Sequence, residues 1–450
     1  MSVEESTASE HEHVNREEQR PRTKIIGLEV PIFFGVVAIV LIGVYMEILP
    51  DNLTSGLIVA MVLGGALKWV GDRIPVFNTF GGGPILCILI PALFLYWGIF
   101  PESLATLTDD FYTTFGFADL AVTGIIVGSI LSMDRNLLMK IGIRFFVPLL
   151  GAVLCGLLAG GLAGQLIGFG FTEAMFFVVG PIMGGGMAAG AVPMSEIYAA
   201  SQGGDPGEVL ARLAPAVMVG NMICILVAGA LNGLGKRKNK MKNFSGDGAM
   251  LRTKGKEQTF EADNNKDSAF PFSINNLIIG IVISLTLYIL GNALGSLIPA
   301  LHPYVWIILG AALLKIINIL PMEIEKAAGD WYEFITKAWV PAVLVAISAG
   351  MIDFASVLEI VTNPSYISLT ILTVIMAALA AGFIGLMVGF YFVESAIGAG
   401  LGMADMGGSG DVAVLSAGDR MGLMPFLQIS SRIGGAMMLV ILSLLSSILM

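Results

Sequence analysis

Long apolar runs limit the fold of this chain more than any other feature of its sequence. About eleven stretches have the length of some 20 residues that a helix needs to cross the hydrocarbon core of a bilayer. They lie at roughly 25–49, 53–71, 80–99, 116–133, 144–168, 211–235, 274–298, 302–320, 338–358, 366–392 and 429–449. Because backbone groups cannot stay unpaired in lipid, each run is predicted to be helical. The predicted fold class is therefore an all-α membrane protein with about 11 transmembrane helices.

The composition argues against the soluble classes of protein. Of 450 residues, 56% are hydrophobic and 13% are charged, which is about half the charged share of an ordinary soluble domain. A net charge of -10 gives no support to a nucleic-acid partner. Cys87, Cys155 and Cys224 lie in apolar runs without a CxxC spacing or a neighbouring His. We therefore expect no disulfide framework, no metal centre and no cofactor other than a possible Na⁺.

The polar segments predict how the chain is oriented. The first 24 residues lack the apolar core of a signal peptide, so residues 1–24 are expected to be a disordered cytoplasmic tail. The loop at 236–271 holds the densest run of Lys and Arg, and such loops stay cytoplasmic. A nucleic-acid patch is the alternative for this run, but the positive-inside rule explains it without a partner. We expect a cytoplasmic N-terminus and a C-terminus outside.

The two halves of the chain resemble each other weakly. Asn52-Leu53 recurs as Asn276-Leu277, the glycine pair at 185–186 recurs at 407–408, and Arg212 recurs as Arg432, always in the same order. A leading helix at 25–49 then precedes one repeat at 50–235 and a second at 272–450, each with five spans. Because five is odd, the second repeat enters the membrane from the opposite side. Inverted repeats are typical of secondary transporters, whose substrate site lies near the midplane at the repeat interface.

Each half also contains a glycine-rich segment that fits neither a spanning helix nor a solvated loop. PIMGGGMAAGAVPMSEIYA lies in the segment 174–200, and ADMGGSGDVAVLSAGDR lies at the end of the segment 394–418 and just beyond it. Interior glycines weaken a helix by about 1 kcal/mol each. We predict two re-entrant hairpins, whose bared backbone is tolerated only inside protein or beside a water-filled cavity. Flexible hinges or glycine-mediated helix packing are the alternative.

Arg432 is the candidate substrate-binding residue. It lies near the start of the last apolar run, and a charge within the hydrocarbon is costly unless it faces a cavity or a counter-ion. Its planar guanidinium fork matches a carboxylate, so a carboxylate substrate would explain both its type and its burial. A structural ion pair with Asp411 or Asp419 is the alternative.

Oxygen-bearing side chains beside the second glycine segment suggest a cation site. Asp411 and Ser409 offer hard oxygen ligands for Na⁺, and Asp411 also offers a protonatable group. A helix N-cap or a salt bridge is the alternative for Asp411. Glu196 and Glu394 border the two segments and are expected at the surface.

The segments MGGGMAAGAVPMSEIY and GGSGDVAVLSAGDRMGLMPFLQISSRIGG resemble the paired motifs of the 2-hydroxycarboxylate transporter family, and the similarity covers nearly the whole chain. The resemblance implies opposed re-entrant hairpins, a homodimer in a bacterial inner membrane, and an elevator-like movement of a substrate domain. It also implies uptake of malate, citrate or a related acid with Na⁺ or H⁺. Exchange of malate or citrate for lactate is one alternative, and an anion channel is another. An enzyme is not expected.

The resemblance assigns roles to individual positions. Arg432 matches the family's substrate-binding arginine, and Ser431 matches a possible cation-site residue. Met406 stands where sodium-citrate members have arginine, and Met187 stands where they have asparagine, which favours a dicarboxylate such as malate. The predicted substrate-binding set is Arg432, Ser409, Gly407, Gly408, Gly185, Gly186, Met187 and Met406, and the predicted cation set is Asp411, Ser431 and Ser409.

Overall fold

The structure, a computed structural model, is almost entirely helical. It describes residues 24–75, 82–133, 135–237, 243–252, 272–298, 301–352 and 354–449. The expected tail, most of the basic loop at 236–271 and the side chain of Ser409 therefore lie outside the described part. The strands in the described part form one short antiparallel ribbon, in which β1 (Lys24–Ile25) pairs with β2 (Leu28–Glu29).

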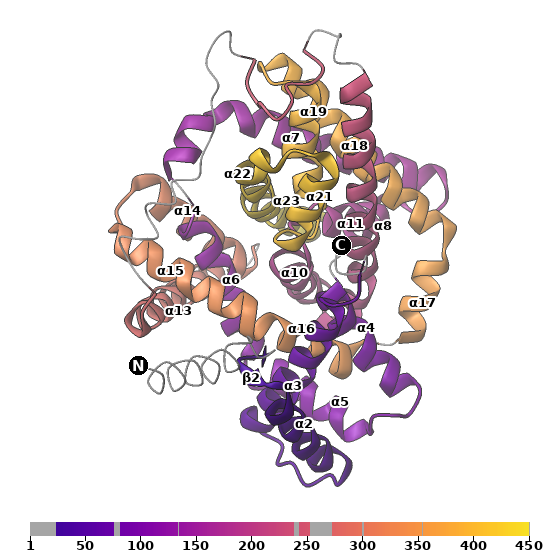
Figure 1. The fold of residues 1–450 in the computed structure, drawn as a ribbon, viewed down its shortest axis with the longest axis vertical. Helices are drawn as coiled ribbons and strands as arrows, with labels where there is room; N and C mark the ends of the chain where they lie inside the picture. Colours follow the sequence, from indigo (N-terminus) through magenta and orange to yellow (C-terminus); the bar gives the residue numbers. More distant parts are fainter. Residues whose placement is uncertain are drawn as a thin grey trace, which may run out of the picture.

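One group of helices, here named the frame bundle, packs around α3, α6, α13 and α16. In Figure 1 its α6, α13, α14 and α15 lie on one side of the molecule, and α2 to α5 lie below. Its members are α2 (Val30–Tyr45), α3 (Leu53–Gly71), α4 (Gly82–Tyr96), α5 (Glu102–Tyr112), α6 (Phe117–Leu131), α13 (Ile274–Leu297), α14 (Pro303–Ile317), α15 (Met322–Phe334), the π-helical turn η5 (Ile335–Trp339) and α16 (Val340–Met351).

The other group, the hairpin bundle, packs around α7, α11 and α18. Its last helices lie at the centre of Figure 1, drawn in yellow. Its members are α7 (Arg135–Leu166), α8 (Phe171–Ala174), η3 (Met175–Val179), α9 (Gly180–Ile182), η4 (Met187–Ala191), α10 (Val192–Gln202), α11 (Pro206–Arg237), α17 (Phe354–Thr362), α18 (Pro364–Met387), α19 (Phe392–Ser395), η6 (Ala396–Leu401), α20 (Gly402–Ala404), α21 (Ser409–Gly418), η7 (Met421–Leu423), α22 (Met424–Ile429), η8 (Ser430–Gly434) and α23 (Gly435–Leu449).

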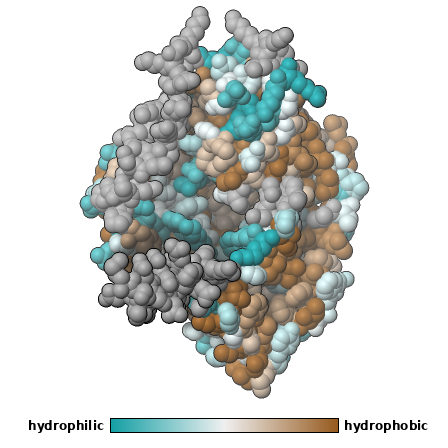
Figure 2. Space-filling view, viewed as in Figure 1, coloured by the Kyte–Doolittle hydropathy of each residue, from teal (hydrophilic) through white to brown (hydrophobic). Residues whose placement is uncertain are grey.

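Many of these helices suit a membrane. In the described residues, seven helices are long and apolar enough to cross it, or eight if α5 and α6, bent by 51°, form one span. A helix lies within each of the eleven predicted runs, but several are short, so the number of spans stays a prediction. Figure 2 shows apolar residues over much of the visible surface, which fits lipid contact.

The first helix starts later than its apolar run predicts. Residues Lys24–Glu29 form the β-ribbon, Gly27 turns with φ +82°, and the helix begins at Val30 with Pro31 in its first turn. Proline suits that position because its missing N–H would have no helical partner there. Other helices begin with a side-chain cap, such as Asn52, whose side chain accepts a hydrogen bond from the Ser55 amide before α3.

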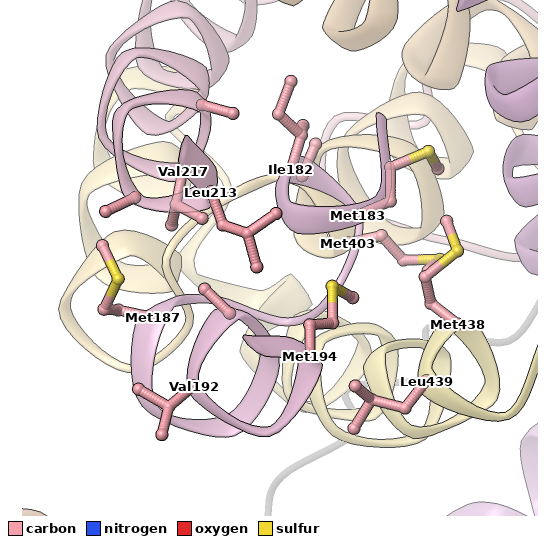
Figure 3. Packing of buried hydrophobic residues seen from close by; sticks show 14 of the residues in the cluster. Ile182, Met183, Met187, Val192, Met194, Leu213, Val217, Met403, Met438 and Leu439 are labelled. Carbon is pink, nitrogen blue, oxygen red and sulfur yellow. The ribbon is translucent and has the colours of Figure 1, made fainter. Parts of the chain in front are cut away.

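Buried methionine side chains fill part of the core of the hairpin bundle. Figure 3 shows methionine side chains from both glycine segments packing with α23. Met183, Met403 and Met438 are each 0% exposed. Methionine is unbranched and polarizable, so it fills the irregular gaps that broken helices leave.

The close approach of α6 to α15 predicts the effect of one substitution. A Cβ on Gly128 would lie 2.5 Å from Tyr332 Cβ and 2.6 Å from the Ala328 carbonyl oxygen. Gly128→Ala should therefore lower the free energy of unfolding by about 1–3 kcal/mol, the usual effect of overpacking. Gly233→Ala is the control, because no atom lies within 4 Å of its added Cβ. Thermal unfolding in detergent measures both, and equal melting temperatures would contradict the tight contact.

Candidate functional site where the two hairpins meet

Both glycine segments form helix–break–helix hairpins. In the first hairpin, residues 183–186 separate α9 from η4, and in the second, residues 405–408 separate α20 from α21. The breaks contain Gly185, Gly186, Gly407 and Gly408, with φ of +84°, +100°, +65° and +52°. Only glycine adopts such backbone without strain, which explains its choice there. Whether the hairpins are re-entrant depends on the membrane and stays a prediction.

The tips of the two hairpins touch each other and η8. A Cβ on Gly185 would lie 2.1 Å from the Ser431 carbonyl oxygen, and one on Gly186 would lie 2.1 Å from the Met406 carbonyl oxygen. These approaches are possible only without side chains. The four predicted glycines and Ser431 are therefore brought to one place, although the two glycine pairs are more than 200 residues apart in the sequence.

Arg432 lies at the boundary between the two bundles. Its Nη1 donates a hydrogen bond to Ser132 Oγ at 3.2 Å, and its guanidinium carbon lies 5.1 Å from the centre of the Tyr332 ring. Ser132 caps the end of α6 and Tyr332 belongs to α15, so both partners come from the frame bundle. A small cavity adjoins the arginine between α6, α14, η4 and α23. Its lining includes Ser129, Ala189, Ser431 and Arg432.

The ion pair considered for Arg432 is not formed. Within the described part of the chain, no carboxylate makes an ion pair with it. Asp419 pairs instead with Lys236 at 3.0 Å on the exposed surface. Arg432 thus keeps donors that a carboxylate could accept.

Two buried carboxyl groups face each other below the second tip. Asp405 is 0% exposed and Asp411 is 2% exposed. They lie within hydrogen-bonding reach of each other, yet Asp405 Oδ2 and Asp411 Oδ1 have no donor in the described structure. Ionised carboxylates only accept hydrogen bonds, so a proton or a metal cation between them would satisfy these oxygens. The N-cap position of α21 is Gly408, and Asp411 lies in the first turn that follows it.

The sequence predicted Asp411 but missed Asp405 and Asn221. Asp405 Oδ1 accepts a hydrogen bond from the Gly407 amide at 2.8 Å. Asn221 of α11 is 0% exposed, and its Oδ1 accepts one from the Met406 amide at 3.1 Å. Both side chains therefore shape the tip. A polar residue inside an apolar helix was the available signal for Asn221, and the position just before the glycines was the signal for Asp405.

The remaining predicted residues differ in their surroundings. Ser431 is 6% exposed, whereas Met406 is half-buried near the tip. Met187 is 4% exposed and belongs to the apolar core. Glu394 is 0% exposed, so the expectation that it lies at the surface is wrong; Arg420 pairs with it inside the protein. Glu196 is half-buried.

This arrangement suits an anion together with a cation. Glycine amides and a guanidinium are donors for a carboxylate, and the facing carboxyl groups are acceptors for a small cation. The two sets lie side by side, since Asp405 holds the amide of Gly407. The site therefore has the chemistry for binding both ions at once.

Comparison with known proteins identifies a set of similar sequences. The model of the 2-hydroxycarboxylate transporter family matches residues 25–444. A Na⁺-malate symporter of Bacillus subtilis is 31% identical over 91% of this chain and 89% of its own length. A malate transporter of Lactococcus lactis is 32% identical over 93% and 96%. A citrate/sodium symporter of Salmonella typhimurium is 31% identical over 95% and 96%. These matches confirm the resemblance seen in the motifs.

The facing carboxyl groups predict an effect of Na⁺ on stability. Asp405→Asn should raise the unfolding temperature in Na⁺-free buffer, because the amide donates to Asp411 and one like charge is gone. A gain of about 1–3 kcal/mol is expected, together with loss of most of the stabilisation that added Na⁺ gives. Asp419→Asn is the control, with a change below about 1 kcal/mol at its exposed pair. A less stable Asp405→Asn protein that keeps the full Na⁺ response would refute the cation site.

Proposed function

We propose that this chain, which belongs to the 2-hydroxycarboxylate transporter family, carries malate across the membrane by symport with Na⁺ or H⁺. The closeness of the two glycine tips, the backbone beside Arg432 and the buried carboxyl groups supports this proposal. Relatives named for malate and for citrate have almost the same identity to this chain. The choice between the two acids therefore rests on the residues of the site.

The substrate binds through two kinds of donor in this proposal. Arg432 holds one carboxylate with its fork, and amides of the hairpin tips hold the other, apart from the Gly407 amide, which already donates to Asp405. Met406 supplies no second cation and Met187 is buried in the core. A third carboxylate would therefore lack a charged partner, which favours malate over citrate.

The coupling cation binds next to the substrate in this proposal, at Asp405 and Asp411, with Ser431 close by. Each dicarboxylate brings two negative charges into a low-dielectric region, where uncompensated charge is costly. A cation at the carboxyl pair also removes the repulsion between Asp405 and Asp411. Binding of either ion therefore favours binding of the other, and this reciprocal effect is the basis of coupling.

The movement that exposes the site to each side is proposed to be an elevator movement of the hairpin bundle against the frame bundle. Support comes from Arg432, which contacts Ser132 and Tyr332 across the boundary. The helices of the two halves also follow one another in matching order, from α3 to α11 and from α13 to α23. We accordingly propose inverted repeats, and a homodimer joined by the frame bundles.

Replacing the guanidinium tests substrate binding. Arg432→Lys keeps the charge and loses the fork, so the half-saturating malate concentration in proteoliposome uptake should rise roughly ten- to a hundredfold. Arg212→Lys is the matched control from the first half, because Arg212 lies on the surface and pairs with Glu173 at 2.5 Å. It should alter uptake by less than about twofold. Unchanged affinity in Arg432→Lys would remove the arginine from the site.

Imposed gradients separate the transport modes. A symporter accumulates labelled malate when a Na⁺ or pH gradient is applied alone. The gradient that drives uptake identifies the coupling ion. An exchanger is instead strongly stimulated when the vesicles are preloaded with lactate. An anion channel shows conductance without accumulation. Failure of both ion gradients to drive uptake would contradict symport.

A further inference from the structure

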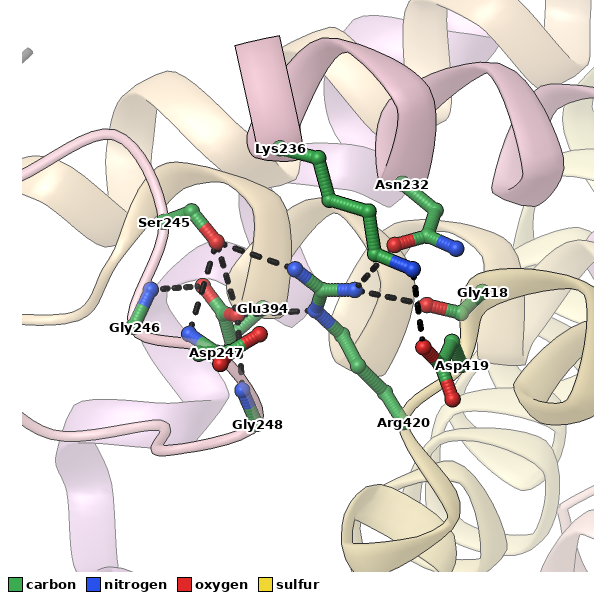
Figure 4. Close-up of polar contacts among 10 residues, drawn as sticks. All are labelled: Asn232, Lys236, Ser245, Gly246, Asp247, Gly248, Glu394, Gly418, Asp419 and Arg420. Carbon is green, nitrogen blue, oxygen red and sulfur yellow. Dashed lines mark hydrogen bonds and ion pairs between the residues drawn. The ribbon is translucent and has the colours of Figure 1, made fainter. Parts of the chain in front are cut away.

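A buried ion pair joins the two ends of the second hairpin. Arg420, which follows α21, donates from Nε to Glu394 Oε1 of α19 at 2.8 Å. The two side chains are 1% and 0% exposed. The guanidinium also donates to Asn232 Oδ1 of α11 at 3.0 Å and to the Gly418 carbonyl at 2.6 Å. Figure 4 shows this network.

A segment of the loop between the two halves completes the network. We name Asn243–Arg252 the strap. Its Ser245 Oγ accepts a hydrogen bond from Arg420 at 2.9 Å, and the amides of Gly246 and Gly248 donate to Glu394 at 2.9 and 3.1 Å. Both charges are therefore satisfied from the strap as well as from the hairpin (Figure 4).

The strap also runs along the first residues of the hairpin. The amides of Phe392 and Val393 donate to the carbonyls of Asn243 and Phe244 at 3.2 and 3.0 Å. The rings of Phe244 and Phe392 stack with centres 5.3 Å apart. At the other end of the strap, the Arg252 amide donates to the Gly389 carbonyl at 3.0 Å. The strap is thus attached to the hairpin bundle along its length.

The contact between the strap and the Glu394 carboxylate requires glycine at two positions of the strap. A Cβ on Gly246 would lie 2.3 Å from the Tyr391 ring, and Gly248 has φ +97°. Only a chain without side chains at these points brings two amides to one buried carboxylate. A buried ion pair such as Arg420–Glu394 is costly unless every donor and acceptor is satisfied. The strap supplies four of the hydrogen bonds that satisfy it.

We propose that Arg420 and the strap are positioning elements for the candidate site. The α21 helix runs from Ser409 at the tip to Gly418 beside Arg420, a distance of about 15 Å at 1.5 Å per residue. A stiff rod held at its base keeps its tip in place. Arg420, Glu394 and the strap therefore hold Asp411 against Asp405 and set the direction of the glycine amides, although none of them touches the ligand.

Releasing the strap tests this role. Gly246→Ala forces the strap away from Tyr391. Gly233→Ala, at an exposed position of α11, is the control. Two quantities are measured in detergent and in proteoliposomes: hydrogen–deuterium exchange of the amides at 392–418, and the half-saturating concentrations of malate and Na⁺. We expect faster exchange and a rise of about tenfold in both concentrations, with a maximal rate per folded carrier that changes little.

A milder variant keeps the test decisive if Gly246→Ala fails to fold. Ser245→Ala removes an acceptor of Arg420 and a donor, at 3.5 Å, to Glu394, but keeps both members of the ion pair. Ser447→Ala, at an exposed position, is its control. Faster exchange at 392–418 with unchanged half-saturating concentrations, or no change in either, would overturn the proposal. The uptake measurement rests on the proposed function, whereas the exchange measurement does not. A wild-type protein that carries no hydroxycarboxylate would therefore defeat the proposed function alone.

Discussion

The contact between bared backbone segments at the hairpin tips is the constraint on which the rest of the structure depends. In lipid, a broken helix leaves amides and carbonyls without partners, so each break must be enclosed by protein. Gly185 and Gly186 achieve this by lying directly against the backbone of Ser431 and Met406. Methionines of both hairpins and α23 fill the space around them. The glycines that permit this close approach are the same ones that form the candidate site, so the packing and the proposed binding chemistry have one origin.

The fold class and the family could be predicted from the sequence, because long apolar runs and glycine spacing are local signals. The grouping of Gly185, Gly186, Gly407 and Gly408 followed from the internal similarity of the two halves. The partners of Arg432 could not be predicted. Ser132 and Tyr332 come from distant helices of the other bundle, and nothing in their local sequence marks them. The burial of Glu394 was missed for the same reason, since its partner Arg420 lies at the far end of the hairpin.

Buried charged side chains at the base and at the tip of the second hairpin differ in whether their hydrogen-bonding groups have partners. At the base of the second hairpin, Arg420 and Glu394 are paired, fully enclosed and satisfied by neighbouring amides and side chains. At its tip, Asp405 and Asp411 retain oxygens without donors, and Arg432 has a hydroxyl and a ring as partners in place of a carboxylate. Enclosed and satisfied charges give rigidity. Charged groups with unused hydrogen-bonding capacity are suited to binding, so the contrast separates the base of the hairpin from the candidate site at its tip.

Arg432 belongs to η8, a π-helical turn of five residues inserted between α22 and α23. Such a turn holds one residue more than the α-helical turn that it replaces. Each added or removed residue rotates the following side chains by about 100° around the helix axis. The direction in which the guanidinium points is therefore encoded by length as well as by residue type. An insertion or deletion before Arg432 in this turn would therefore rotate the arginine away from the boundary between the bundles, even if every side chain around it were kept.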